Sequence, residues 1–258
     1  MKRDIMVALY SEDTYVLDWM SLLVVRDWRT RVVAEVTNQA QLSEFLGKEH
    51  LICDVFIVDL DSASDMKQTI IEIADSIKDI KIIGLCRNQK LDFFRCIPVS
   101  AIAGLLYKQE IETSLGWAIT FAAEGKPVYT PRSLEDTWKA NFILSKDRLV
   151  LRARNYPGLT DRQSEIARLA IIFSIGRRDL ADELKISDQW SYGVVSELYD
   201  HLGLSDLLDE NQDFHSILEN DWVIKSHIDE ILEDLGTSKK ARDLETLAFH
   251  LLTMPVIE

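Results

Sequence analysis

The strongest constraint on the fold is an alternation of short β-branched runs with longer segments of helical periodicity over the first 110 residues. Segments of helical spacing separate the strand-like runs and are long enough for crossover helices. The strand-like runs are Ile5–Tyr10, Val32–Val36, Asp54–Leu60, Lys81–Leu85 and Ala101–Tyr107, and the helical segments are Tyr15–Val25, Asn38–Lys48, Met66–Ile77 and a weaker one near Leu91–Ile97. The alternation predicts a doubly wound α/β domain with a five-stranded parallel sheet and helices on both faces.

Composition adds two expectations about the class of protein. With 258 residues, of which 47% are hydrophobic and 28% charged, the chain can bury a sizeable core and form two modest domains. No apolar stretch approaches the roughly 20 residues that cross a bilayer, and the run behind Lys2 and Arg3 is broken at Ser11. The three cysteines, Cys53, Cys86 and Cys96, form no metal-binding or disulfide pattern. We therefore expect a cytoplasmic protein without a membrane segment.

Polar residues gather where the predicted strands end. In a doubly wound sheet, ligands bind at the carboxyl ends of the strands. Strand one ends before Ser11, Glu12 and Asp13, strand three ends in Asp59, strand four in Leu85-Cys86 and strand five in Tyr107-Lys108.

This set of strand ends resembles the receiver domain of bacterial response regulators. The segment Leu105–Pro131, with Gly125, Val128-Tyr129 and Pro131, resembles the last strand, last helix and exit turn of the NarL/FixJ subfamily. The resemblance covers roughly residues 4 to 132. It implies that Asp59 is the phosphoacceptor, that Lys108 pairs with the phosphoryl group, and that a histidine kinase is a possible partner.

Two departures from the family pattern bear on phosphorylation. The resemblance implies a pair of acids after strand one as Mg²⁺ ligands, and the chain has Ser11-Glu12, followed by Asp13. Cys86 stands where the family has Ser or Thr, and a thiol is a weak hydrogen-bond donor. Glu12 and Asp59 are the candidate ligands if Mg²⁺ binds at all; no other cofactor is expected. We predict weak or absent phosphorylation, and both a phosphorylatable switch and an inert receiver scaffold stay open.

The second half resembles a LuxR-type helix-turn-helix. Its marks are Leu159-Thr160, Leu180-Ala181, Ile186-Ser187 and Leu202-Gly203, with one extra residue near Phe173–Gly176. The implied organisation is a receiver-like domain over residues 1–132, a linker with a helix over 133–158, and an all-α helix-turn-helix domain over 159–258.

Two segments compete as the recognition helix. The contiguous one, Gln189–Leu198, carries no Lys or Arg, and Glu197 and Asp200 would face DNA phosphates. The second, Val223–Ser238, makes Asp188–Trp222 an acidic insertion, and we favour it. It supplies Lys225, Ser226 and His227 as DNA contacts. Further candidate phosphate contacts are Arg177, Arg178, Lys239, Lys240 and Arg242.

The charge distribution weakens any DNA-binding hypothesis. The net charge is −14, and residues 151–258 hold 11 basic and 21 acidic residues against 18 and 22 in residues 1–150. Because phosphate contacts dominate affinity for DNA, such a domain would bind weakly and in a salt-sensitive way.

Two functions therefore compete, and neither is enzymatic. The first is an atypical response regulator that binds DNA and regulates transcription, most simply as a homodimer. The second is a protein-interaction module, an adaptor, anti-regulator or DNA mimic, whose acidic segment 188–234 engages a protein partner.

Overall fold

The computed structural model describes residues 4–88, 92–142, 144–154, 156, 158–204, 222–235 and 241–258. Within these ranges, the side chains of residues 99, 222–225, 234–235 and 241–243 are not described. The chain forms two compact units: residues up to Ala153 together with Pro255–Glu258, and Arg154–Met254. We call them the receiver-like domain and the helical domain.

The receiver-like domain contains the five predicted parallel strands. They are β1 (Ile5–Tyr10), β2 (Thr30–Val36), β3 (Val55–Asp59), β4 (Lys81–Cys86) and β5 (Ile102–Tyr107). Their order in the sheet is β2-β1-β3-β4-β5, and each neighbouring pair is parallel. This is the flavodoxin-like order of doubly wound sheets. The predicted fold class is confirmed.

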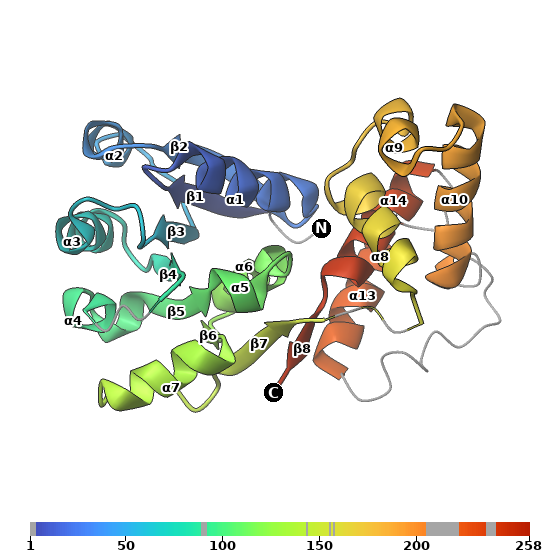
Figure 1. The fold of residues 1–258 in the computed structure, drawn as a ribbon. Helices are drawn as coiled ribbons and strands as arrows, with labels where there is room; N and C mark the ends of the chain where they lie inside the picture. Colours follow the sequence, from blue (N-terminus) through green and yellow to red (C-terminus); the bar gives the residue numbers. More distant parts are fainter. Residues whose placement is uncertain are drawn as a thin grey trace. The chain divides into compact units, whose positions relative to one another are not determined.

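Helices cover both faces of this sheet. They are α1 (Thr14–Arg26), α2 (Gln39–Leu46), α3 (Met66–Ser76), α4 (Phe93–Cys96), α5 (Lys108–Ile111) and α6 (Leu115–Ala123). Figure 1 shows α2, α3 and α4 side by side on one face and α1 with α6 on the other. Every residue of β3 and β5 is buried, as expected for strands with helices on both sides. The carboxyl ends of β1, β3 and β5 therefore meet at one edge of a rigid core.

The sheet extends beyond the predicted five strands. β6 (Val128–Tyr129) and β7 (Leu149–Ala153) continue it in parallel, and β8 (Pro255–Ile257) pairs antiparallel with β7. Helix α7 (Pro131–Lys139) lies between β6 and β7 in the chain. The domain therefore extends past residue 132, the boundary predicted from the sequence, and β7 lies in the segment 133–158 that was predicted to be a linker. Pairing satisfies backbone groups that a free edge of β5 would leave open.

The helical domain begins at a capped helix. Thr160 and Gln163 form a capping box at α8 (Asp161–Ala167), which continues as a π-helical turn, Arg168–Ile172. Within this turn the Phe173 N–H donates to the Arg168 carbonyl at 2.9 Å, a bond that spans five residues instead of four. The wider turn takes up an additional residue without breaking the helix. It lies just before the position where the sequence indicates an insertion.

The helix-turn-helix itself is formed by α9 (Arg177–Leu184) and α10 (Asp188–His201). Ser187 caps α10 by accepting a hydrogen bond from the Trp190 N–H at 3.2 Å. The buried residues Ser191, Val195, Leu198 and Leu202 recur at helical spacing and pack α10 against α9 and α8. The last two described helices, α13 (Trp222–Leu235) and α14 (Ala241–Thr253), pack against each other.

This packing overturns the alignment that we favoured from the sequence. The helix that follows α9 in the motif is α10, the contiguous candidate, and not α13. The choice between the two helices rests on Leu198, which is 1% exposed, and Val195, which is 2% exposed, because both lie on the buried side of α10. Asp188–His201 is therefore a structural helix of the domain and not part of an insertion. No helix in the described ranges is both long and apolar enough to span a bilayer.

Candidate functional site

The structure brings Asp59 and Lys108 together at the carboxyl edge of the sheet, as predicted. Asp59 ends β3 and is fully buried, and Lys108 follows β5 directly. The Lys108 Nζ lies 2.5 Å from the Asp59 Oδ1. The side chain of Lys108 is 12% exposed and that of Asp59 is 1% exposed, so this ion pair is largely shielded from water.

The Asp59 carboxylate has two further hydrogen-bond donors within the protein. The Ser11 hydroxyl donates to Oδ2 at 2.8 Å, and the Asp61 N–H donates to Oδ1 at 3.1 Å. Asp61 also joins the site through its own side chain, since Lys108 Nζ lies 3.0 Å from its Oδ2. Asp61 is not among the site residues predicted from the sequence, although its place two residues after Asp59 was a usable signal. Lys108 thus bridges two carboxylates.

Glu12 and Asp13 are committed to other contacts. The Glu12 Oε1 accepts hydrogen bonds from the Tyr10 hydroxyl at 2.8 Å and from both the N–H and the hydroxyl of Ser64. These bonds lower the pKa of Glu12, the Ser64 N–H contributing most. Asp13 caps α1 by accepting from the N–H groups of Tyr15 and Val16. The two acids thus stabilise the start of α1 and the loop after β3.

This arrangement does not fit a Mg²⁺ site. A Mg²⁺ ion needs oxygen ligands around it, and here the cation held between Asp59 and Asp61 is the Lys108 ammonium group. Ser11 offers a hydroxyl where a carboxylate would be needed, and the described contacts of Glu12 Oε1 are to hydrogen-bond donors. Among the described residues, no group of three or more His, Cys, Asp or Glu side chains could hold a metal ion. The ligand pair predicted from sequence, Glu12 and Asp59, is therefore not supported by the contacts.

Cys86 and Tyr107 belong to the core beside this site. Cys86 is fully buried, and it pairs in register with Tyr107 on β5. The Tyr107 hydroxyl donates a short hydrogen bond to the buried Asp136 of α7. Burial and this hydrogen bond raise the pKa of Tyr107. The strand that precedes Lys108 is thereby tied to α7, an element outside the predicted receiver boundary.

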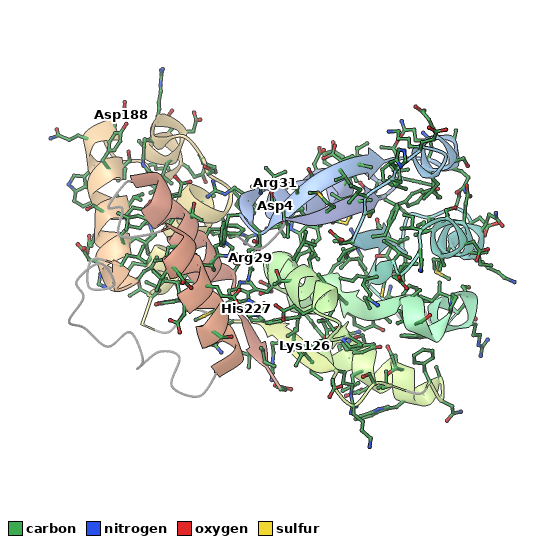
Figure 2. The ribbon with its side chains drawn as sticks, turned by 180° about the vertical axis from the view of Figure 1, so that it is seen from behind. Asp4, Arg29, Arg31, Lys126, Asp188 and His227 are labelled. Carbon is green, nitrogen blue, oxygen red and sulfur yellow. The ribbon has the colours of Figure 1, made fainter. Side chains whose placement is uncertain are left out.

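The second candidate site is the exposed face of α10. Its side chains include Trp190 and Tyr192, which are 65% and 63% exposed, together with the exposed acids Asp188, Glu197 and Asp200. Figure 2 labels Asp188 in the first turn of this helix. The helix contains no Lys or Arg. A helix that reads the major groove presents donors to base edges and phosphates, and this face presents mainly acceptors and aromatic rings.

The structure describes only some of the basic residues that were predicted as DNA contacts. Arg177 and Arg178 occupy the start of α9, where Arg178 is exposed and the Arg177 guanidinium lies 5.9 Å from the centre of the Tyr192 ring. Arg177 is partly exposed. Lys239 and Lys240, with the side chains of Lys225 and Arg242, lie outside the described residues.

His227 cannot read DNA from its position in this structure. It lies on α13, labelled in Figure 2, and is 4% exposed beside Ile228 and Ile231, which are fully buried. Its neighbour Ser226 is exposed, and the other exposed described residues of α13 include Asp229, Glu230 and Glu233. The prediction that His227 contacts bases is therefore wrong, because an apolar stripe of this helix takes His227 into the core.

Comparisons with known proteins give similar folds only. No family model and no curated protein matches the sequence. Among solved structures, RcsB of Salmonella enterica serovar Typhimurium bound to promoter rprA is 21% identical, over 78% of this chain and 92% of that chain, with a TM-score of 0.45. The isolated REC domain of the same RcsB is 22% identical over 52% and 99%, with a TM-score of 0.45. The response regulator ChrA of a heme-sensing two-component system is 18% identical over 78% and 90%, with a TM-score of 0.40.

The chain combines two folds. A β2-β1-β3-β4-β5 sheet with an acid and a lysine at its carboxyl edge is followed by a domain with a helix-turn-helix. The strand order, the packing of α10 on α9 and the contacts of Asp59 define these two folds.

Proposed function

We propose that this protein is a regulator of response-regulator build whose receiver-like domain works without phosphoryl transfer. It acts by binding and not by catalysis, and it needs no histidine kinase. The observation that carries the proposal is the set of donors on Asp59: Lys108, Ser11 and the Asp61 N–H satisfy both carboxylate oxygens.

The chemistry of phosphoryl transfer explains why this set matters. An attacking carboxylate and the incoming phosphoryl group are both negative, and a divalent cation normally neutralises the charge that builds up between them. That cation is held by clustered carboxylates. Here Ser11 supplies no charge, and Lys108 bridges Asp59 and Asp61. Asp59 is therefore a paired structural carboxylate.

Acetyl phosphate tests this proposal. The wild-type chain, incubated with acetyl phosphate and Mg²⁺, should show no added phosphoryl group by intact mass. Ser11→Asp places a carboxylate next to Asp59 and should gain an adduct that Asp59→Asn abolishes, whereas the neutral control Ser11→Asn should not. Stoichiometric phosphorylation of the wild-type chain at Asp59 would overturn the proposal.

DNA is the first candidate for what the helical domain binds. The helix-turn-helix supports it, as do Arg177 and Arg178 at the start of α9. The similar RcsB structure is a complex with a promoter. A homodimer would place two such motifs on adjacent half-sites. Because α10 supplies no cation, binding through α9 alone would be weak.

The test is anisotropy of labelled duplex DNA against salt. Each phosphate neutralised by a side chain contributes about −0.9 to the slope of log affinity against log salt concentration. If DNA is the target, Arg177→Ala with Arg178→Ala should reduce the magnitude of the slope by about 2. The matched control Arg132→Ala removes an exposed arginine of the receiver-like domain and should leave the slope unchanged. Absence of binding even at about 50 mM salt would leave the second candidate.

The second candidate is a protein partner. One observation favours it: the face of α10 that the motif leaves exposed carries Trp190, Tyr192 and acids in place of cations. Aromatic residues are enriched at the centres of protein interfaces.

A further inference from the structure

One stripe of α10 has the composition of a docking surface. Trp190, Gly193, Glu197 and Asp200 recur at intervals of three and four residues, so they share one side of the helix. All four are exposed. The opposite side holds Ser191, Val195 and Leu198, which anchor the helix to α9 and α8. The stripe is thus displayed by a helix whose position is fixed by its own core.

Gly193 in the middle of this stripe is not required by the fold. A Cβ built at Gly193 would meet no atom within 4 Å, so packing within the chain does not exclude a larger residue. Glycine inside a helix costs about 1 kcal/mol relative to alanine. What it supplies here is an open patch of helix backbone next to the Trp190 ring, and such a patch allows another backbone to approach closely.

The charges around the patch determine which charge a partner must carry. Asp188, Glu197 and Asp200 are exposed on α10, and the helix has no basic residue other than His201, which lies 3.6 Å from Glu197. An exposed indole ring also attracts cations over its face. DNA, which carries a phosphate at every nucleotide, would be repelled by this side of the helix. A partner with Lys or Arg side chains is complementary to it.

We propose that the stripe Trp190–Gly193–Glu197–Asp200 docks a basic amphipathic helix of a partner protein. The partner helix packs across Gly193 at short interaxial distance, places an apolar residue against Trp190, and sets its Lys or Arg side chains against Glu197 and Asp200. This inference rests on the second candidate of the proposed function, binding to a protein, and it names the chemistry of that partner.

The experiment uses the full chain and a defined probe. The probe is a fluorescently labelled, helix-forming peptide of Leu, Ala and Arg with its arginines on one face, and the comparison peptide has Glu in place of Arg. Anisotropy should show binding of the Arg peptide that weakens with salt, and no binding of the Glu peptide. Trp190→Ala should lower the affinity for the Arg peptide by about ten-fold or more, as expected for an aromatic anchor. The matched control Trp138→Ala removes a tryptophan that is 56% exposed on α7 and should change nothing.

Gly193 gives the variant that separates docking from folding. Gly193→Ala should raise the melting temperature, since alanine favours the helix, and should still lower the affinity for the Arg peptide by about three-fold. Gly193→Leu should lower this affinity by about ten-fold. A purely structural glycine would give the rise in melting temperature without the loss of binding. Glu197→Gln with Asp200→Asn should flatten the salt dependence.

Three results would overturn the inference. The first is equal binding of the Arg and Glu peptides, or no binding of either. The second is that duplex DNA competes with the Arg peptide for binding and that Trp190→Ala removes this competition. The third is concentration-dependent self-association, seen by sedimentation, that Trp190→Ala removes, because the occupant is then a second copy of the chain. None of these measurements involves Asp59. Failure of the docking inference can therefore be told apart from failure of the proposed function, which the acetyl phosphate experiment tests.

Discussion

The receiver-like domain and the helical domain differ in how each departs from the module that it resembles. In the receiver-like domain the key side chains are present and close together, but Lys108 and Ser11 already satisfy Asp59. In the helical domain the motif is formed, but the face of α10 that would meet DNA has the wrong charge. Each domain therefore has the fold of the module that it resembles, whereas the contacts of Asp59 and the charge of the exposed α10 face do not suit the expected chemistry. The buried core of each domain determines its backbone fold, and a few polar residues determine which ligand the domain can bind.

The largest expected effect tests the receiver-like domain. Lys108→Met leaves the buried Asp59 carboxylate without its cation and should lower the free energy of unfolding by about 3 to 5 kcal/mol in urea denaturation. The double variant Asp59→Asn with Lys108→Met should recover most of this loss. Lys126→Met, which breaks an exposed pair with Glu124, should cost less than about 1 kcal/mol. A small effect of Lys108→Met would show that the Asp59–Lys108 pair is not structural.

The next prediction concerns the two sides of α10. Leu198→Ala should destabilise the helical domain by about 2 to 5 kcal/mol, since Leu198 is buried between helices. Trp190→Ala should change stability by no more than about 0.5 kcal/mol, because Trp190 is exposed. Thermal unfolding followed by circular dichroism checks both. If Trp190→Ala were the more damaging of the two, α10 would be turned the other way and its exposed stripe would not exist.

A smaller effect tests whether Asp13 is a helix cap. Asp13→Ala should cost about 1 kcal/mol, while Asp13→Asn should cost little, because asparagine caps a helix about as well as aspartate. Urea denaturation measures both variants. A Mg²⁺-dependent rise in melting temperature of the wild-type chain that Asp13→Asn removes would instead assign Asp13 to a metal site.

At neutral pH no effect is expected from the last prediction, which concerns the alkaline stability of the receiver-like domain. Burial raises the pKa of Tyr129 to about 12 from the ordinary value of 10.0. The folded state therefore favours the neutral phenol, and this contribution is complete below pH 10 and is lost as the pH rises from about 10 through about 12. Tyr129→Phe should reduce the fall in melting temperature across that window. Identical pH profiles for the two proteins would mean that Tyr129 ionises as freely in the folded state as in the unfolded one.

Several features of both domains could be predicted from the sequence. The five strands, their alternation with helices and the meeting of Asp59 with Lys108 follow from local periodicity and from the rule that parallel strands end at one edge. The helix after Ser187 also has a local signal, since Ser187 is a good N-cap.

Other features could not be predicted, because they depend on contacts between distant residues. The pattern identified neither β7, whose run LVLRA contains Arg152, nor the three-residue β8, and pairing with a neighbouring strand defines both. The choice of α10 over α13 as the partner of α9 was decided by apolar contacts, which outweigh the charge pattern that favoured α13 in the sequence.

The sequence by itself therefore determined the class of fold, the position of the acid and the lysine at the sheet edge, and the sign of the charge on each segment, since these depend on residue type and on spacing along the chain. The tertiary structure decided that Asp59 is fully paired, that Glu12 and Asp13 serve local structure, and that His227 is buried while Trp190 is exposed. The physical reason is that hydrogen bonds and burial are properties of pairs and clusters of residues far apart in the chain, and only the packed fold determines which donor meets which acceptor and which face of a helix is covered.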